Sequence, residues 1–138
     1  MMAGLLLEVV TPERVVVSEQ VDIVTAPGSL GEFGVLEGHV SFLTGIVPGP
    51  LKYTTGGKAH YLAVTSGFCE VSANKVCVLV DAAEKAEEID VDRAMRAMER
   101  AKERLARARG EPDIDTIRAE MALRRALARI KVAELAKK

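Results

Sequence analysis

The stretch Ala82-Ala83-Glu84-Lys85-Ala86-Glu87-Glu88-Ile89-Asp90 divides the chain into two parts with different sequence patterns. Before it, short runs rich in Val, Ile, Leu and Thr alternate with turn residues, and no helical pattern of ten residues occurs. After it there is no β-branched run, and the helix formers Ala, Glu, Arg, Met and Leu dominate. We therefore predict an α+β fold, with a β module at residues 1–84 and a helical module at residues 85–138.

The β module contains eight short apolar runs separated by turn signals. Short strands at regular spacing are typical of an antiparallel sandwich or barrel, and the missing helices argue against parallel βαβ units. Gly56-Gly57 and Ala73-Asn74 are candidate hairpin turns. The predicted strands are Leu5–Val10, Val15–Glu19, Val21–Ala26, Val40–Ile46, Leu51–Thr54, Ala59–Thr65, Phe68–Val71 and Val76–Ala82.

The helical module reads as an antiparallel two-helix hairpin. Asp90 is a candidate N-cap for a helix over Val91–Arg109, and Gly110-Glu111-Pro112 ends it. Asp113 or Asp115 can cap a second helix that runs to the C-terminus, and so short a linker makes the helices neighbours. The predicted apolar stripes are Ala94, Met98, Ala101, Leu105 and Ala108 on the first helix, and Ile117, Met121, Leu123, Leu127 and Ile130 on the second.

The first stripe is rich in alanine, which buries little apolar area per residue. We therefore expect the hairpin to be held weakly and to be able to open, as a switch element does.

Composition and charge narrow the function classes. Of the 138 residues, 49% are hydrophobic but only 4% are aromatic, so the core must be aliphatic. No apolar run approaches the roughly 20 residues of a membrane span, and we expect no signal or transit peptide. Cys69 and Cys77 are expected to be reduced thiols, as in cytosolic proteins.

The net charge of −1 hides an asymmetry between the two modules. Residues 1–90 carry 5 Lys/Arg and 12 Asp/Glu, a net charge of −7, whereas residues 91–138 carry 14 Lys/Arg and 8 Asp/Glu, a net charge of +6. A division this large indicates different partners for the two modules.

Three ordered segments resemble the epsilon subunit family of rotary ATP synthases. Gly31-Glu32-Phe33-Gly34-Val35-Leu36-Glu37-Gly38-His39 is similar to the family's Gly-Glu-x-Gly-x-Leu-x-Gly-His loop. The run from Tyr61 to Val71 is similar to its Gly-Phe-x-Glu-Val strand, and Ala82–Asp90 to its junction between sandwich and helices. The order and spacing of these segments fit the family from end to end.

The resemblance implies a ten-stranded β-sandwich followed by a two-helix hairpin. It implies a non-catalytic central-stalk subunit that couples proton-driven rotation to ATP synthesis, peripheral to the cytoplasmic face of the bacterial inner membrane. The implied partners are the gamma subunit, the membrane c-ring and, when the hairpin swings up and inhibits ATP hydrolysis, the catalytic beta subunit. By the same likeness, His39 lies near gamma and Glu32 faces the c-ring; the plainer interpretation of Glu32 is an exposed turn carboxylate.

Ile89-Asp90-Val91-Asp92-Arg93-Ala94 matches the Ile-Asp-x-x-Arg-Ala motif of epsilon subunits that bind ATP. The resemblance implies a regulatory site, not a catalytic one, and no phosphate-binding Gly-x-x-x-x-Gly-Lys-Ser/Thr loop occurs. Planar guanidinium groups suit phosphate, whereas Glu84 and Asp90 can accept from the adenine amino group or the ribose. In the plainer interpretation, Asp90 is an N-cap and Arg93 its neighbour in an ion pair. The implied ATP-site residues are Glu84, Ile89, Asp90, Arg93, Ala94, Arg125 and Arg129, with Arg100 on roughly the same helix face as Arg93.

The second helix carries a basic cluster that resembles the family's contact with an acidic loop of the beta subunit. A charge run is usually a solvated face, and nucleic acid is a further alternative. The surplus of positive charge favours an acidic partner, and the cluster lacks the interleaved aromatics of nucleic-acid sites. Its members are Arg118, Arg124, Arg125, Arg129 and Lys131.

An enzyme built on a small β-barrel is the other alternative. It requires a metal or a nucleophile constellation, and His39 and His60 lack metal-ligand spacing. Ser29, Ser41 and Ser66 have no base nearby in the sequence. The sequence therefore predicts a chain that does no chemistry of its own.

Overall fold

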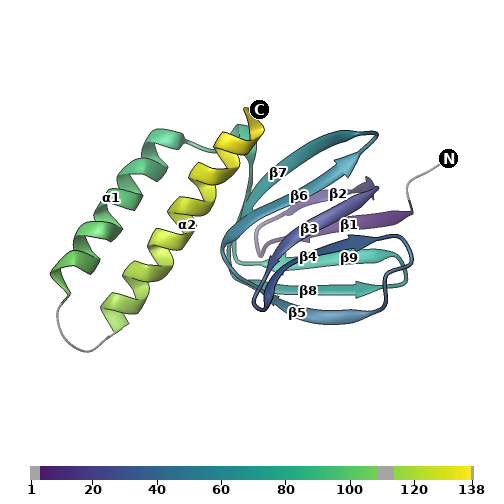
Figure 1. The fold of residues 1–138 in the computed structure, drawn as a ribbon, viewed down its shortest axis with the longest axis horizontal. Helices are drawn as coiled ribbons and strands as arrows, with labels where there is room; N and C mark the ends of the chain where they lie inside the picture. Colours follow the sequence, from purple (N-terminus) through teal and green to yellow (C-terminus); the bar gives the residue numbers. More distant parts are fainter. Residues whose placement is uncertain (1–3, 109–113, 138) are drawn as a thin grey trace.

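The computed structural model describes residues 4–108 and 114–137, which form a β-sandwich followed by a hairpin of two helices (Figure 1). The predicted α+β fold is confirmed. The strands are β1 (Leu5–Val10), β2 (Val15–Val21), β3 (Ile23–Gly28), β4 (Gly31–Leu36), β5 (Phe42–Ile46), β6 (Gly49–Thr55), β7 (Lys58–Val64), β8 (Gly67–Ser72), β9 (Lys75–Val80) and β10 (Ala83–Lys85). A 3₁₀ turn, η1 (Ala86–Glu88), leads into helices α1 (Val91–Arg107) and α2 (Ile114–Ala136).

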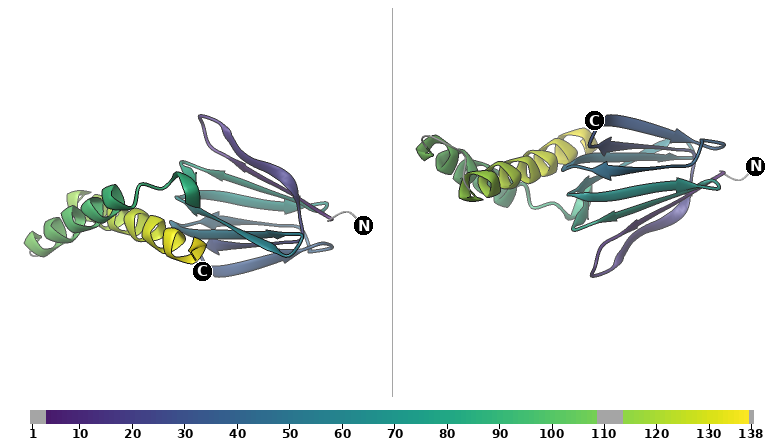
Figure 2. Two further views of the ribbon diagram at one scale, coloured as in Figure 1. Left: turned by 90° about the horizontal axis from the view of Figure 1, so that it is seen from above. Right: turned by 90° about the horizontal axis from the view of Figure 1, so that it is seen from below.

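The strands form one sheet in the order β10-β7-β6-β3-β5-β8-β9-β1-β2, with β4 added beside β3. Figure 2 shows this sheet folded into two facing layers. Alternate side chains point into the space between the layers, so Leu5, Leu7 and Val9 of β1 are fully buried. The core is aliphatic, as the composition predicts.

One pairing departs from the antiparallel prediction. β1 lies parallel to β9, with Leu6 opposite Lys75 and Val10 opposite Leu79, whereas its other neighbour, β2, is antiparallel. A parallel pair needs a long connection, and here the intervening strands supply it.

All eight predicted strands overlap observed ones. Two further observed strands, β4 and β10, were not predicted. β4 carries two glycines, and β10 has only three residues, so neither gives a clear apolar run. The resemblance to the epsilon family implied ten strands, and ten are observed in residues 4–108 and 114–137. Both predicted hairpin turns are confirmed by positive φ angles at Gly56, Gly57, Ala73 and Asn74.

Cys69 and Cys77 point to opposite faces of the sheet. Cys69 pairs with Val78 and is buried, whereas Cys77 pairs with the exposed Glu70. Burial raises the pKa of the Cys69 thiol to about 12. Because the two side chains diverge, they cannot form a disulfide without movement of the backbone.

The first helix agrees with its prediction at its N-terminus. The Asp90 side chain accepts a hydrogen bond from the Arg93 backbone N–H at 3.0 Å, which confirms the N-cap. Ala94 and Ala101 of the predicted stripe are buried. The predicted end, Arg109, lies outside the described residues.

The apolar face predicted for the second helix is partly wrong. Ile117 and Leu127 are 55% and 44% exposed. The helix is buried on two sides instead of one, because it lies between α1 and strands β6 and β7 (Figure 1). Asp115 lies inside the first turn of the helix and does not precede it, and Asp113 lies outside the described residues. The buried residues are Ala119, Ala126, Ala128 and Val132.

These four residues divide between two faces of α2. Ala119 and Ala126 are seven residues apart and share one face, whereas Ala128 and Val132 lie nearly half a turn around the helix from Ala126. Both contacts are therefore made mainly by small side chains, each of which contributes little burial energy. Alanine-rich packing is confirmed for Ala94 and Ala101 of α1, whereas the buried alanines of α2 are not residues of its predicted stripe.

Candidate functional site

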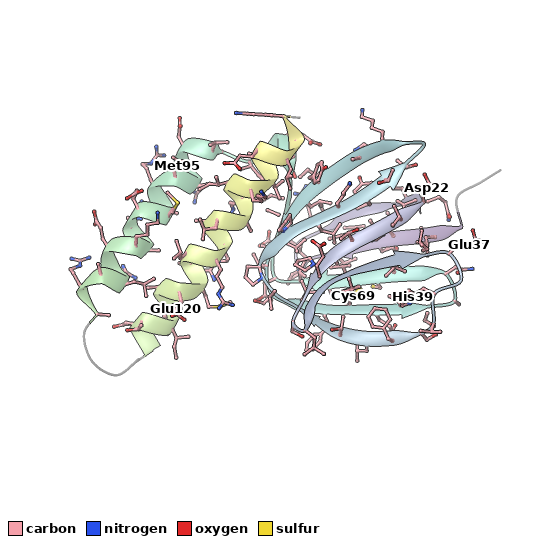
Figure 3. The ribbon with its side chains drawn as sticks, viewed as in Figure 1. Asp22, Glu37, His39, Cys69, Met95 and Glu120 are labelled. Carbon is pink, nitrogen blue, oxygen red and sulfur yellow. The ribbon has the colours of Figure 1, made fainter. Side chains whose placement is uncertain are left out.

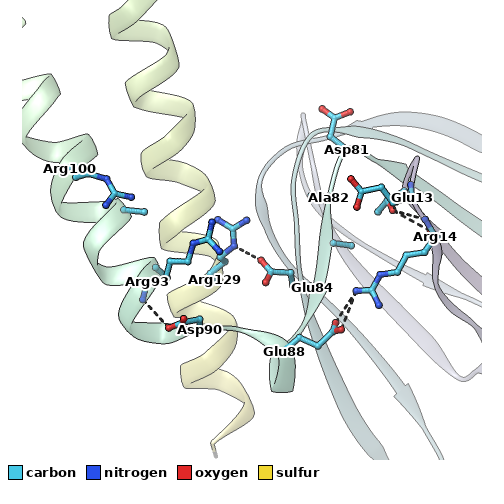
Figure 4. A pocket seen from close by; sticks show the side chains of 14 residues that line it. Glu13, Arg14, Asp81, Ala82, Glu84, Glu88, Asp90, Arg93, Arg100 and Arg129 are labelled. Carbon is cyan, nitrogen blue, oxygen red and sulfur yellow. Dashed lines mark hydrogen bonds and ion pairs between the residues drawn. The ribbon is translucent and has the colours of Figure 1, made fainter.

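A polar pocket of about 510 Å³ lies where the hairpin meets the sandwich (Figure 4). Its walls come from the β1–β2 turn, from the segment that contains β10 and η1, and from both helices. This places residues from both ends of the chain around one cavity. The lining residues are Thr11, Glu13, Arg14, Asp81, Ala82, Ala83, Glu84, Glu88, Asp90, Arg93, Ala94, Ala97, Arg100 and Arg129.

Helix α1 presents two arginines to this pocket. The Asp90 cap fixes where the helix begins, so that Arg93 and Arg100, seven residues apart, lie on the same face. Ala94 and Ala97 lie beside them, and their small side chains leave room for a ligand.

The second helix contributes Arg129, which is bound to the sandwich. Its Nε–H donates to Oε1 of Glu84 on β10, and both side chains are about one-third exposed. Glu84 is itself held by the sheet, since β10 pairs with β7. This ion pair joins the hairpin to the β module.

The linker before α1 is tied to the sandwich by a second ion pair. Arg14 Nη2 lies 3.2 Å from both carboxylate oxygens of Glu88 in η1. Glu88 Oε1 also accepts from the backbone N–H of Lys85 at 2.9 Å. The hydrogen bond from the Lys85 backbone, followed by that from Arg14, holds the pKa of the Glu88 carboxyl below its ordinary value. Thr11 closes the turn that presents Arg14, because its hydroxyl accepts from the backbone N–H groups of Glu13 and Arg14.

The pocket combines arginines from both helices with carboxylates from the segment between the sandwich and α1. Figure 4 shows Arg93, Arg100 and Arg129 on the helices and the carboxylates of Glu84 and Glu88 on the segment that leaves the sandwich. Among the described residues, no ion pair engages Arg93 or Arg100. Such guanidinium groups can bind an anion, and their planar fork matches the geometry of phosphate and of carboxylate. In the same described ranges, no cluster of His, Cys, Asp and Glu has the arrangement of a metal site.

The predicted basic cluster on α2 separates into two rows. Arg118, Arg125 and Arg129 recur at helical spacing along one side, whereas Arg124 and Lys131 lie on another. Arg118, Arg124 and Lys131 are exposed. The described part of α2 therefore carries no single basic stripe.

The end of the sandwich remote from the hairpin carries Glu37 and His39 (Figure 3). The His39 ring lies 5.0 Å from that of Phe42, and Gly38 N–H donates to Oδ1 of Asn74 at 2.7 Å. Asn74 also accepts from Leu6 N–H through its carbonyl, so one residue ties the 37–40 loop to the start of β1.

An apolar patch lies on the outer face of β5, β8 and β9. Leu43, Phe68 and Leu79 are each more than half exposed. Phe68 is directly opposite Leu79 on β9 and Gly45 on β5, which places Leu43 diagonally beside it. Contiguous exposed apolar side chains of this kind mark surfaces that bind a partner.

Comparison with known proteins accounts for both modules. Residues 5–86 match the family "ATP synthase, Delta/Epsilon chain, beta-sandwich domain", and residues 87–134 match "ATP synthase, Delta/Epsilon chain, long alpha-helix domain". The chain belongs to the delta/epsilon chain family of ATP synthases.

Within this family, the chain is similar to bacterial epsilon chains. The "ATP synthase epsilon chain" of Nitratidesulfovibrio vulgaris strain DP4 is 53% identical over 126 residues, which cover 91% of this chain and 92% of the relative. The epsilon chain of Carboxydothermus hydrogenoformans is 58% identical over 101 residues, or 73% of this chain and 75% of the relative. The predicted identity as an F-type epsilon subunit is confirmed.

Solved structures show the same fold in the assembled enzyme. A chain of the Euglena gracilis mitochondrial ATP synthase superposes with a TM-score of 0.80 at 26% identity, covering 99% of this chain and 82% of that chain. A chain of the Tetrahymena thermophila enzyme shares the fold, with a TM-score of 0.60 at 16% identity and coverage of 99% and 98%. The epsilon chain is thus a non-catalytic subunit of the central stalk. In the parts of it that the structure describes, neither helix is long and apolar enough to cross a membrane.

The structure brings together most of the site residues expected of this epsilon chain. Glu84, Asp90, Arg93, Ala94 and Arg129 line the pocket together with Arg100. Ile89 and Arg125 are not among the lining residues, although Arg125 lies one turn from Arg129 on the same side of α2.

Sequence reasoning missed the residues that the sandwich contributes. Thr11, Glu13, Arg14 and Asp81 line the pocket, and Arg14 and Glu88 are 74 positions apart in the chain. No spacing or motif in the epsilon chain marks such a distant pair.

Replacing Asn74 with glycine is expected to loosen the 37–40 loop of the epsilon chain. Glycine keeps the positive φ of the turn but removes the acceptor for Gly38 N–H, at a cost of about 1 kcal/mol in the free energy of unfolding. Amide hydrogen exchange should show faster exchange at Gly38. Asn74→Asp retains the acceptor oxygen and serves as the matched control; equal exchange at Gly38 in both variants would contradict the assignment.

Proposed function

We propose that this chain couples proton-driven rotation to ATP synthesis in the central stalk, and that its hairpin inhibits ATP hydrolysis under the control of bound ATP. In this proposal, residues 1–84 form the assembly module, which contacts gamma and the c-ring, and residues 85–138 form the regulatory module. The chain then sits peripherally at the cytoplasmic face of the bacterial inner membrane. The observation that carries the regulatory part is the pocket between the modules, lined by Arg93 and Arg100, which form no ion pair with any residue that the structure describes.

The position of the pocket gives ATP a way to control the hairpin. Its walls include α1, α2 and the sandwich, so a ligand that bridges them stabilises the docked hairpin and is lost when the hairpin leaves. The described contacts between the modules are the Glu84–Arg129 and Arg14–Glu88 ion pairs and the packing of α2 on β6 and β7, to which α2 brings small buried side chains such as Ala128 and Val132. Because this docking contact is weak, a modest free energy of ligand binding can determine whether the hairpin is docked or undocked.

The required energy is within reach of a metabolite. Moving a two-state element from 1:99 to 99:1 takes about 5.5 kcal/mol of differential binding. A ligand at a thousand times its dissociation constant supplies about 4.1 kcal/mol. Cellular ATP would therefore shift the hairpin strongly at micromolar affinity and weakly at millimolar affinity.

The test is isothermal titration of the purified chain with MgATP and then with MgADP. We expect saturable binding that favours ATP and produces no hydrolysis. Heat signals indistinguishable from dilution up to millimolar MgATP would remove the regulatory site and leave the assembly function standing on the family match alone.

The partner contacts follow from the exposed surfaces. His39, at the end of the sandwich remote from the hairpin, contacts the gamma subunit, and Glu32, beside the β3–β4 turn at the opposite end of β4, contacts the c-ring. When the hairpin is raised, Arg118, Arg124 and Lys131 meet an acidic loop of the beta subunit. Opposite charges support this last contact, because the residues after position 90 carry a net charge of +6.

Phe68→Ser is expected to weaken assembly with gamma without unfolding the chain. Phe68 is exposed at the centre of the apolar patch, and buried aromatic anchors dominate interface energies, so the affinity should fall about tenfold or more. The measurement is binding of the variant to an ATP synthase complex that lacks its epsilon subunit. Val15→Ser, an exposed apolar change on β2 outside the patch, should bind as the parent does. Equal affinity of both variants would place the gamma contact elsewhere.

A further inference from the structure

Glu84 is engaged by an arginine at the pocket, and this changes the role expected of it. From the sequence, Glu84 could accept from the adenine amino group or the ribose of a bound nucleotide. In the structure, its Oε1 accepts from Arg129 Nε, and the pair spans the pocket wall from β10 to α2. We propose that Glu84 is a positioning residue that holds Arg129 for the phosphates and does not read the base. This inference rests on the proposed regulatory ATP site.

The atoms used by the ion pair support this role. A guanidinium group carries five N–H donors: one on Nε and four on the two Nη nitrogens. The hydrogen bond to Glu84 uses Nε, and among the described residues no hydrogen bond or ion pair engages either Nη group of Arg129. The Nη donors remain free to form the fork that suits a phosphate.

The supports on either side of the pair are rigid. Glu84 lies in a strand paired with Ala63 of β7, and Arg129 lies in the long helix α2. An arginine held by its Nε loses less side-chain freedom when a ligand binds than a free one does. Arg93 and Arg100 lack such a partner among the described residues, so Arg129 is the pre-oriented arginine of the pocket.

The neighbouring arginine of the sandwich has a different arrangement. Arg14 uses Nη2 to bind Glu88, and both carboxylate oxygens of Glu88 lie 3.2 Å from it. This occupies one of the nitrogens that a phosphate fork needs. Arg14 therefore fastens the linker to the sandwich, whereas Arg129 keeps its Nη donors available for a ligand.

The test compares Glu84→Ala with Glu84→Gln, each with Arg129 present and in an Arg129→Ala background. Both changes remove the negative charge of the carboxylate, and this loss by itself favours anion binding. Only glutamine keeps a side-chain oxygen that accepts a hydrogen bond from Arg129 Nε. The probes in calorimetric titrations are MgATP, MgITP, which lacks the adenine amino group, and inorganic tripolyphosphate, which lacks a base. We expect Glu84→Ala to bind all three about three- to tenfold more weakly than Glu84→Gln. In the Arg129→Ala background this difference should vanish, and the ratio of ATP to ITP affinity should be the same in the parent and both variants.

Three results would overturn this inference and leave the proposed ATP site in place. The first is that Glu84→Ala loses ATP binding but keeps tripolyphosphate binding, and the second is that its ratio of ATP to ITP affinity changes. The third is that the affinity difference between Glu84→Ala and Glu84→Gln persists in the Arg129→Ala background. The first two would show that Glu84 reads the base. If the parent chain binds none of the probes, the proposed ATP site falls, and this inference falls with it.

Discussion

Replacing Gly67 with alanine is expected to destabilise the sandwich by about 3 kcal/mol or more. A Cβ atom at this position would lie 1.9 Å from the carbonyl oxygen of Leu79 and 2.7 Å from the Cα of Val80. Both atoms belong to the backbone of β9, which is paired with β8 at this point and cannot withdraw without breaking the ladder. Urea unfolding followed by far-ultraviolet circular dichroism measures the loss.

Gly34→Ala is the matched control for this prediction. The nearest atom to a Cβ at Gly34 is the Val24 carbonyl oxygen, 3.9 Å away, and its φ is not positive, so the change in stability should stay within about 0.5 kcal/mol. Both glycines belong to segments that resemble the epsilon family. If the two variants unfold at the same urea concentration, the prediction is wrong. The close approach of β8 and β9 would then not be the reason for a glycine at position 67.

Arg93→Ala is expected to lower the affinity for MgATP about tenfold or more. Arg93 lies in the first turn of α1, faces the pocket and has no ion-pair partner among the described residues, so its guanidinium is available to the phosphates. Hydrogen bonds to charged groups contribute about 1.5–3 kcal/mol each, which corresponds to a factor of ten or more. Calorimetric titration of the variant with MgATP gives the ratio directly.

Arg124→Ala removes the same charge from the other row of α2 and controls for net charge. Arg124 is exposed and does not line the pocket, so its variant should bind MgATP nearly as the parent does. Equal weakening in the two variants would mean that charge alone attracts the nucleotide. An unchanged affinity in Arg93→Ala would remove the Ile-Asp-x-x-Arg-Ala segment from the site and leave Asp90 as a helix cap.

The fold was predictable where the pattern is local. A short apolar run bounded by turn residues marks a strand such as Leu5–Val10, and the Asp90 cap marks where α1 begins. The parallel pairing of β1 with β9 was not predictable, because no local signal states which strand lies beside which. The faces of α2 were missed for a related reason: a helix packed on two sides has no single apolar stripe, and its buried alanines look like ordinary helix formers.

The same distinction applies to the site. Asp90, Arg93 and Arg100 share one helix, so their common face follows from helical spacing. Arg14 reaches the pocket from the first hairpin of the sandwich, and only the folded sheet brings it to Glu88. The pairing of Glu84 with Arg129 depends on how α2 docks, which residue spacing does not determine.

The parallel pairing of β1 with β9 also fixes an order of events during synthesis. β1 leaves the ribosome first, yet the residues that complete its second edge, from Lys75 onward, emerge only after most of the sandwich has been translated. The sheet can therefore close only late, through contacts distant in sequence, which fold slowly. The helices emerge afterwards and meet a β surface that is already complete. In a nascent chain, docking of the hairpin onto the sandwich is therefore the last folding step. It is also the first step that can be reversed without unfolding the sandwich.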